Sequence, residues 1–464
     1  MRIALRSINI AFLLAGLGIS VAVAQSSNDA LALDGRWDAS LVNNGPTVPF
    51  RLDISGLGPT LKGTFYDGFK PYDETTSATY QDGKLVLKAE HYLTTITATL
   101  KNGELVGDVV LLGPGFHLQY GLQAKHHVES ATQPENVPVI AGLWELPLES
   151  PSAKGEKAFR LIARQNGADA EVSILRIDGD TGAYSGTYKN GKWVLSHFDG
   201  SRPGVIEVSA KKDGTLEVVQ HNEALKKAIE GDSPETKTAD ASGKQYGAAP
   251  TETFTGDKLV AYRPEVARAK GFPEPDNFDT HTTVRNANEK FAFSFPDANG
   301  KLVSSDDPRF KGKVVLAIVT GTWCPNCHDE ARFLVQLDKK YRDKGLAIVA
   351  IDFEEPEEQD KLTRERAFIE EYGVKYTYLI AGAPSEMWEK VPQAVNLNTW
   401  PATIFVGRDG LVKGIHSGFA SQASGEFNNQ LQQEFTAKIE QLLAENSSKK
   451  QITSVSASSP KHGE

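Results

Sequence analysis

The two cysteines of this 464-residue chain lie three positions apart, in the segment TGTWCPNCHDEA (residues 320–331). Two kinds of chemistry use this spacing. Cys324, Cys327 and His328 match the C-x-x-C-H pattern of covalent haem attachment, and Trp323 followed by C-x-x-C is equally the pattern of a dithiol redox centre. A disulfide that closes so short a loop adds little stability, since cross-links act mainly by restricting long loops. The pair therefore indicates chemistry or ligand binding.

Disulfide exchange needs a thiolate, and free cysteine has a pKa of about 8.5, so one cysteine must be activated. The apolar run VVLAIVTGT from Val314 predicts a strand buried on both faces. After it, apolar residues at three- and four-residue spacing predict a helix that begins at the cysteines. Unpaired N–H groups and the dipole favour negative charge at a helix N-terminus. We therefore expect Cys324 to be the nucleophile and Cys327, one turn inside the helix, to be the less exposed resolving thiol.

Further strands and helices follow in alternation. LAIVAIDF from Leu346 predicts a strand that ends near the polar Asp352, EQDKLTRERAFIEEYG predicts a helix that ends at Gly373, and YTYLI predicts a third strand. TWPATIFVGRDGLVKGIH predicts two strands joined by an Asp-Gly hairpin. A final helix from about Gly425 carries one apolar face.

This order resembles the thioredoxin superfamily, and more closely the exported TlpA/ResA-type thiol-disulfide oxidoreductases. The segments that carry the resemblance are FSFPDANGK, TGTWCPNCHDE and WPATIFVGRDG, within residues 288–446. The resemblance implies an α/β thioredoxin-like fold in which Cys324 and Cys327 cycle between dithiol and disulfide, with no cofactor and no metal. It also implies that Pro401 is a cis-proline beside the cysteines.

Other site residues follow from the same resemblance. Trp323 and Trp400 are expected at the partner groove. Glu330 matches an acidic position of the family and is expected to exchange a proton with Cys327, although a surface glutamate is the competing interpretation. Arg332 stands where many relatives have a proline, so the helix is expected to be straighter. For His328 we favour an ordinary solvated helix position over one that faces Cys324.

Other functions fit parts of the sequence. A c-type haem domain is usually small and helical, whereas a buried strand leads into this motif. A single C-x-x-C supplies only half of the ligands of a structural zinc site. The peroxidatic P-x-x-x-T-x-x-C pattern fails, because Ala317 and Gly321 occupy its other positions. The chain also fits a binding protein whose N-terminal repeats dock a partner or polymer.

The N-terminal half contains an internal duplication at offsets of 107 to 111 residues. GRW at Gly35 matches GLW at Gly142, and TYQDGKLVL from Thr79 matches TYKNGKWVL from Thr187. Short alternating runs broken by Asp-Gly or Asn-Gly turns predict two antiparallel all-β units. Trp37 and Trp144 are expected in their cores.

Composition and the N-terminal residues indicate the partners and the cellular compartment of the protein. The net charge of -10 leaves no overall basic character, so we do not expect nucleic acid or an anionic membrane surface as a partner. Residues 1–24 have the charged, apolar and small-residue regions of a secretory signal, with a retained anchor as the alternative. We expect a periplasmic protein without stable membrane insertion that meets disulfide-containing envelope proteins and a membrane thiol electron donor. The expected domains are a signal peptide (1–24), two β-units (25–132 and 133–222), a linker (223–287), a thioredoxin-like domain (288–446) and a disordered tail (447–464).

Overall fold

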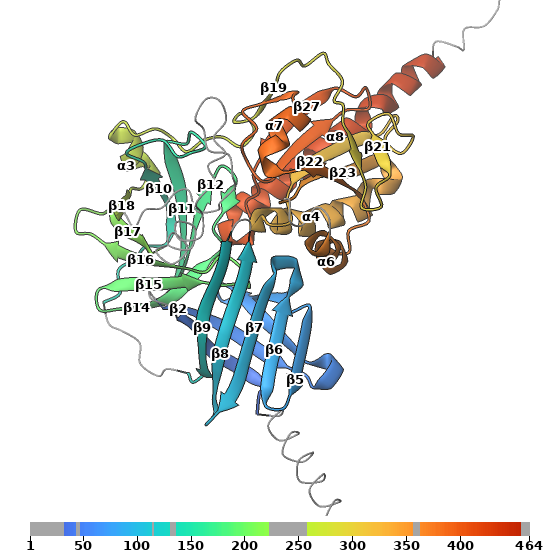
Figure 1. Cartoon of the computed structure of the whole chain (residues 1–464). Helices are drawn as coiled ribbons and strands as arrows, with labels where there is room; N and C mark the ends of the chain where they lie inside the picture. Colours follow the sequence, from blue (N-terminus) through green and yellow to red (C-terminus); the bar gives the residue numbers. More distant parts are fainter. Residues whose placement is uncertain are drawn as a thin grey trace, which may run out of the picture.

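The computed structural model describes residues 32–42, 47–113, 116–129, 136–221, 258–355 and 362–455. The predicted signal peptide lies outside the described residues. Figure 1 shows two β-domains and an α/β domain that meet around one helix, α4 (Pro325–Tyr341). None of the helices in these ranges has the length and apolarity needed to cross a membrane.

The first β-unit is a nine-stranded antiparallel sheet in the order β4-β3-β2-β1-β9-β8-β7-β6-β5. Strands such as β2 bury every second residue, as expected when one face of a sheet covers a core. Its elements are β1 (Gly35–Val42), β2 (Val48–Ser55), η1 (Gly58–Thr60), β3 (Lys62–Asp67), β4 (Lys70–Glu74), β5 (Ser77–Gln81), β6 (Lys84–Ala89), η2 (Glu90–Tyr92), β7 (Thr94–Lys101), β8 (Glu104–Gly113) and β9 (Phe116–His126).

The second β-unit forms a sheet in the order β10-β11-β12-β14-β15-β16-β17-β18, with β13 beside β12. An antiparallel bridge between Glu145 and Tyr262 joins its first and last strands, so the sheet closes on itself. Its elements are β10 (Gly142–Pro147), β11 (Ala158–Asn166), β12 (Asp169–Arg176), β13 (Gly179–Asp180), β14 (Tyr184–Lys189), β15 (Lys192–His197), β16 (Gly204–Ala210), β17 (Leu216–His221) and β18 (Lys258–Ala261).

The strand registers support the predicted duplication. Trp37 pairs with Leu52 in the first unit, and Trp144 pairs with Leu161 in the second. Both indoles are buried, and each donates its N–H to the carbonyl four residues earlier. The expectation that both tryptophans are core residues is confirmed.

The predicted linker over 223–287 is wrong in its second half. Strand β18 pairs with β17 and completes the second sheet, and α3 (Pro264–Ala269) follows it. Arg263, at the start of α3, also contacts the second unit, because its guanidinium carbon lies 3.7 Å from the centroid of the Trp144 ring. A short, polar-flanked strand carries little apolar pattern, so its tertiary partners decide its structure.

The two β-units pack against each other. Phe198 of the second unit joins the core of the first and lies 4.9 Å from the Phe50 ring. Thr94 donates its hydroxyl to the carbonyl of Gly200 at 2.6 Å. The N-terminal half is thus one continuous body formed by two related sheets.

The C-terminal domain has a five-stranded sheet in the order β24-β23-β22-β26-β27, in which β22, β23 and β24 are parallel and β26 and β27 antiparallel. All seven residues of β22 are buried, as expected for a strand covered on both faces. The elements are β19 (Thr283–Val284), β20 (Ser294–Pro296), β21 (Leu302–Ser304), β22 (Val314–Thr320), α4, η3 (Arg342–Lys344), β23 (Leu346–Phe353), α6 (Thr363–Tyr372), β24 (Thr377–Gly382), η4 (Pro384–Glu386), α7 (Met387–Lys390), β25 (Ala394–Val395), β26 (Ala402–Val406), β27 (Val412–Ser417), η5 (Gln422–Ser424) and α8 (Glu426–Val455).

Helix α8 confirms the predicted apolar face, because Leu431, Phe435 and Ile439 are buried against α4 and the sheet. The helix continues to Val455, so the tail predicted from residue 447 is helical in its first part. Residues 456–464 lie outside the described residues. The domain thus places the N-terminus of α4 at the end of β22, where the sheet meets both β-units (Figure 1).

Candidate active site

The dithiol lies where β22 passes into α4. Cys324 is the N-cap residue of the helix and Cys327 lies in its first turn. Both thiols are free and buried, with 4% and 2% of the residue exposed. The Cys324 thiol donates a hydrogen bond to the carbonyl of Trp400 at 3.4 Å. Cys324 therefore lies at the end of α4 where the first backbone N–H groups have no partner within the helix.

Cys327 lies on the protein side of this pair. Burial, and then the neighbouring Cys324, raise the pKa of the Cys327 thiol well above its usual range. The Cys327 thiol therefore keeps its proton in the resting dithiol, and a base must remove the proton before Cys327 can act as a nucleophile.

Glu330 lies one helical turn beyond Cys327 and is 1% exposed, so the surface interpretation of this glutamate is wrong. Its carboxylate accepts a hydrogen bond from the Thr403 hydroxyl on β26. Burial raises the pKa of Glu330 to about 8. Burial, and then Glu330, raise the pKa of Tyr376 well above its usual range.

The loop before β26 supplies the other wall of the site. The Trp400–Pro401 peptide bond is cis, as the sequence predicts. Trp323 donates its indole N–H to the carbonyl of Phe353 at 2.9 Å, and its ring lies edge-on to Trp400 with centroids 5.1 Å apart. Trp323 is partly exposed, whereas Trp400 is buried. The two indoles therefore form an apolar surface beside Cys324.

Comparisons with known proteins agree with this geometry. The family model of the AhpC/TSA family matches residues 287–415. The thioredoxin-like protein YneN of Bacillus subtilis is 32% identical over 126 residues, which cover 27% of this chain and 68% of YneN. The chain belongs to the thioredoxin-like proteins. The thiol-disulfide oxidoreductase ResA of Bacillus anthracis is 29% identical over 120 residues, which cover 26% of this chain and 62% of ResA.

Among solved structures, a thiol:disulfide interchange protein of the thioredoxin family from Chlorobium tepidum TLS matches with a TM-score of 0.27 and 22% identity. The match covers 35% of this chain and 99% of that protein.

In the thioredoxin-like domain His328 is fully buried, so the predicted solvated position is wrong. Its ring nitrogens contact the Tyr372 hydroxyl at 2.8 Å and the Thr322 carbonyl at 2.6 Å. Burial, and then His91, lower the pKa of His328 well below its usual range. The ring also packs on Tyr92, at 4.4 Å between centroids. Both nitrogens are engaged inside the protein, which disfavours His328 as a haem ligand.

The side chains of α4 contact the β-units directly. Arg332 forms an ion pair with Asp73 at 3.1 Å, so the residue that replaces the family's proline contacts the first unit. Tyr72 of the same unit donates its hydroxyl to Asp329. Burial raises the pKa of Asp329 to about 7, although Arg202 opposes this. Direct contact from both β-units with the helix that carries the dithiol is a feature that the sequence does not predict.

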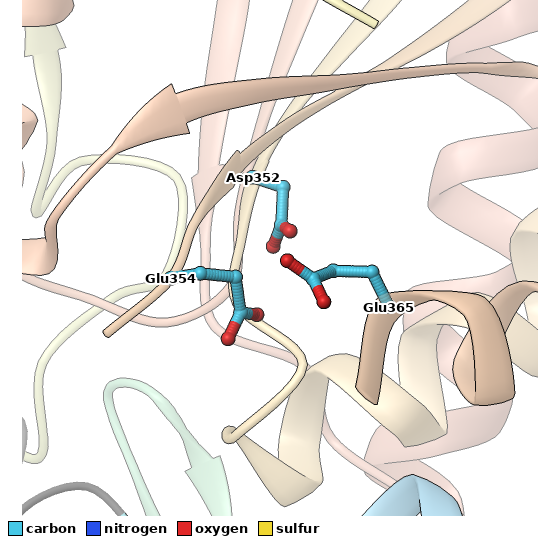
Figure 2. A group of neighbouring side chains, drawn as sticks. All are labelled: Asp352, Glu354 and Glu365. Carbon is cyan, nitrogen blue, oxygen red and sulfur yellow. The ribbon is translucent and has the colours of Figure 1, made fainter. Parts of the chain in front are cut away.

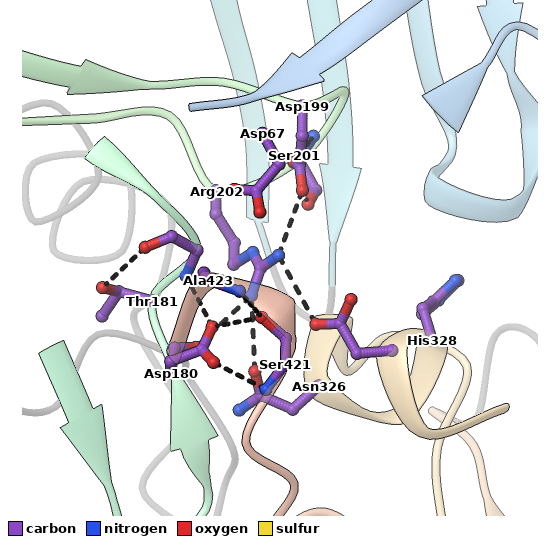
Figure 3. Close-up of polar contacts among 12 residues, drawn as sticks. Asp67, Asp180, Thr181, Asp199, Ser201, Arg202, Asn326, His328, Ser421 and Ala423 are labelled. Carbon is purple, nitrogen blue, oxygen red and sulfur yellow. Dashed lines mark hydrogen bonds and ion pairs between the residues drawn. The ribbon is translucent and has the colours of Figure 1, made fainter. Parts of the chain in front are cut away.

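The second unit contacts the motif between the cysteines. Asn326 donates to the carbonyl of Asp178 at 3.0 Å, and Arg202 donates to the Asn326 side-chain oxygen at 3.3 Å. Figure 3 shows Arg202 beside Asn326 in the first turn of α4. Arg202 also forms ion pairs with Asp199 at 3.0 Å and with Asp329 at 3.9 Å. The partners of the motif come from distant strands, so no local pattern identifies them.

Three buried carboxylates lie behind the active-site loop, and their nearest oxygens are within 4.8 Å of one another (Figure 2). They are Asp352, Glu354 and Glu365. Glu354 accepts hydrogen bonds from the backbone and hydroxyl of Thr322 at 2.6 Å and from Arg364 at 2.8 Å. Burial, and then Glu354 and Glu365, raise the pKa of Asp352 well above its usual range. Carboxylates of this spacing suit a hard cation. The ion pair between Glu354 and Arg364 and a protonated Asp352 also explain how the three groups lie together. Glu354 holds the loop before Cys324 through Thr322.

Proposed function

We propose that this chain is an exported thiol-disulfide oxidoreductase that reduces disulfides in proteins of the cell envelope. The observation that carries the proposal is the position of Cys324 at the N-terminus of α4, with its thiol 3.4 Å from the Trp400 carbonyl and Cys327 buried behind it. The name of the relative ResA supports the reaction class. Export to the periplasm rests on the signal-like residues 1–24.

In the first step Cys324 loses its proton to the solvent, and its thiolate attacks one sulfur of the substrate disulfide. A bond forms between that sulfur and Cys324 Sγ, the substrate S–S bond breaks, and the released thiolate takes up a proton. Cys327 then loses its proton and attacks Cys324 Sγ. The mixed disulfide breaks, the Cys324–Cys327 disulfide forms, and the second substrate thiolate takes up a proton. Two electrons and two protons have then passed from the dithiol to the substrate.

Glu330 is the group proposed to accept the proton of Cys327. With a pKa of about 8, roughly one-tenth of the Glu330 side chains are ionised at pH 7, and this form accepts the proton. The hydrogen bond from Thr403 fixes its orientation. A membrane-bound thiol donor then reduces the Cys324–Cys327 disulfide and completes the cycle.

Two variants test the proposal. Cys324→Ala abolishes disulfide reduction, because the attacking sulfur is lost. Cys327→Ser accumulates mixed disulfides with substrate proteins, which non-reducing gels and mass spectrometry detect, because no resolving thiol remains. Full activity of Cys324→Ala would refute the proposed function.

The direction of the reaction is tested by the reduction potential of the pair. A value near that of thioredoxin, about −270 mV, supports a reductase. A much more positive value would reassign the protein to disulfide formation or isomerisation.

A further inference from the structure

A short segment of the second β-unit lies against the dithiol motif. The segment, residues 177–180, consists of the two residues after β12 and strand β13, and we refer to it as the β12 strap. Asn326, between the two cysteines, donates to the carbonyl of Asp178 at 3.0 Å. Phe419, in the loop after β27, donates its backbone N–H to the same carbonyl at 3.3 Å, and Gly179 forms a parallel bridge with Phe419. The strap thus contacts two parts of the thioredoxin-like domain, the first turn of α4 and the loop after β27.

Both elements lie close to the nucleophile. Asn326 belongs to the motif itself, and the loop after β27 is tied to the cis-proline loop because Gly418 donates to the carbonyl of Pro401 at 2.7 Å. Pro325 and Asn326 at the start of α4 are buried in the assembled chain. The strap therefore lies against two elements that flank Cys324.

Charged and polar groups anchor the strap. The buried Asp180 carboxylate accepts hydrogen bonds from the Ser421 backbone at 2.7 Å, the Ser421 hydroxyl at 2.9 Å and the Ser424 hydroxyl at 2.7 Å. Figure 3 shows this carboxylate facing Ser421, with Arg202 beside it. Arg202 donates to both the Asp180 carbonyl and the Asn326 side chain. These hydrogen bonds give the strap a defined position against the loop after β27.

Gly179 sets how closely the strap approaches. Its φ is +128°, and a Cβ at this position would lie 2.4 Å from the Phe419 carbonyl oxygen and 2.7 Å from the Asn326 side-chain amide. A backbone oxygen cannot move away cheaply, so any larger residue displaces the strap from the motif. The close contact between the two domains depends on glycine here.

We propose that the β12 strap is a specificity-determining wall of the substrate groove. It leaves the side of Cys324 next to the partly exposed Trp323 as the approach for substrate. The dithiol accordingly accepts disulfides in small molecules and in extended segments, and it excludes disulfides embedded in bulky folded surfaces. This inference rests on the proposed thiol-disulfide activity and adds the class of substrate.

The test uses the full chain with Gly179→Ala, and Gly191→Ala is the matched control. Gly191 lies in the same unit with φ +84°, and a Cβ there meets no atom within 4 Å. For each reduced protein, the alkylation rate of Cys324 is measured with iodoacetamide and with a 5-kDa polyethylene glycol maleimide. In Gly179→Ala we expect the ratio of the bulky to the small rate to rise about tenfold, and in Gly191→Ala to stay unchanged. An unchanged ratio in Gly179→Ala overturns the proposal, whether or not the protein proves to be a reductase.

A second readout compares reduction of oxidised glutathione with reduction of a folded disulfide protein. Gly179→Ala raises the relative rate for the folded protein and leaves the glutathione rate within about twofold. Asp180→Asn, which keeps the side-chain shape and removes the charge, shifts both ratios in the same direction by a smaller factor. Equal ratios in wild type and both variants refute the specificity role, whereas loss of activity on both disulfides in Cys324→Ala tests the proposed function separately.

Discussion

Glu330→Gln separates the charge of the buried carboxyl group from its shape. Glutamine keeps a side-chain oxygen that accepts the hydrogen bond from Thr403 and removes the ionisable proton. Burial raises the pKa of Glu330 from 4.5 to about 8. One pKa unit corresponds to about 1.4 kcal/mol, so ionising Glu330 in the folded protein costs roughly 5 kcal/mol relative to the unfolded chain.

Proton linkage gives the direction in which the free energy of unfolding changes with pH. Between pH 4.5 and about 8 the folded protein holds the Glu330 proton and the unfolded chain has lost it. The unfolded state then binds fewer protons, so the free energy of unfolding falls as the pH rises, by at most about 1.4 kcal/mol per pH unit from this group. The stability contributed by the protonated Glu330 is fully present below pH 4.5, falls as the pH rises, and is lost once the pH passes about 8.

Urea denaturation of wild type and Glu330→Gln at intervals from pH 5 to pH 9 measures this effect. The carboxyl groups of Asp329 and Glu156, whose pKa values are raised to about 7, titrate in both proteins, so the difference between the two curves isolates Glu330. We also expect the variant to resolve mixed disulfides about 100-fold more slowly, because a general base typically contributes that factor. Parallel pH curves for the two proteins would refute the buried, protonated state of Glu330.

Two further predictions concern the contacts between elements. Arg332→Met removes the ion pair with buried Asp73 and should lower the free energy of unfolding by about 2 kcal/mol in urea denaturation. The control Lys340→Met removes an exposed ion pair and should change the free energy of unfolding by less than about 1 kcal/mol. Equal effects of the two variants would contradict a stabilising contact between α4 and the first β-unit. Arg263→Ala removes the cation above the Trp144 ring and should lower the thermal midpoint by several degrees, for a loss of about 1 kcal/mol; an unchanged midpoint would show that β18 is held without this contact.

The spacing of apolar residues and the repeated motifs were enough to predict several elements of the fold. The apolar run from Val314 and the cysteines after it predict the strand, the helix and the order of the thiols, because burial on both faces and a helix start leave a clear trace in sequence. The repeated Trp37 and Trp144 predict the two cores, which their equivalent hydrogen bonds confirm. Strand β18 has four residues and no such trace, and its place in the second sheet depends on β17.

The sequence by itself determined the dithiol chemistry, the α/β domain and the duplicated β-units, since each depends on neighbouring residues and their periodicity. Only the tertiary structure decided the surroundings of the dithiol. Tyr72 and Asp329 are 257 positions apart and share a hydrogen bond. The burial of His328 and the fit of Gly179 against the motif likewise depend on distant surfaces. Contacts of this kind arise from the shapes of folded domains, and a helix position alone does not reveal whether water or another domain will cover it.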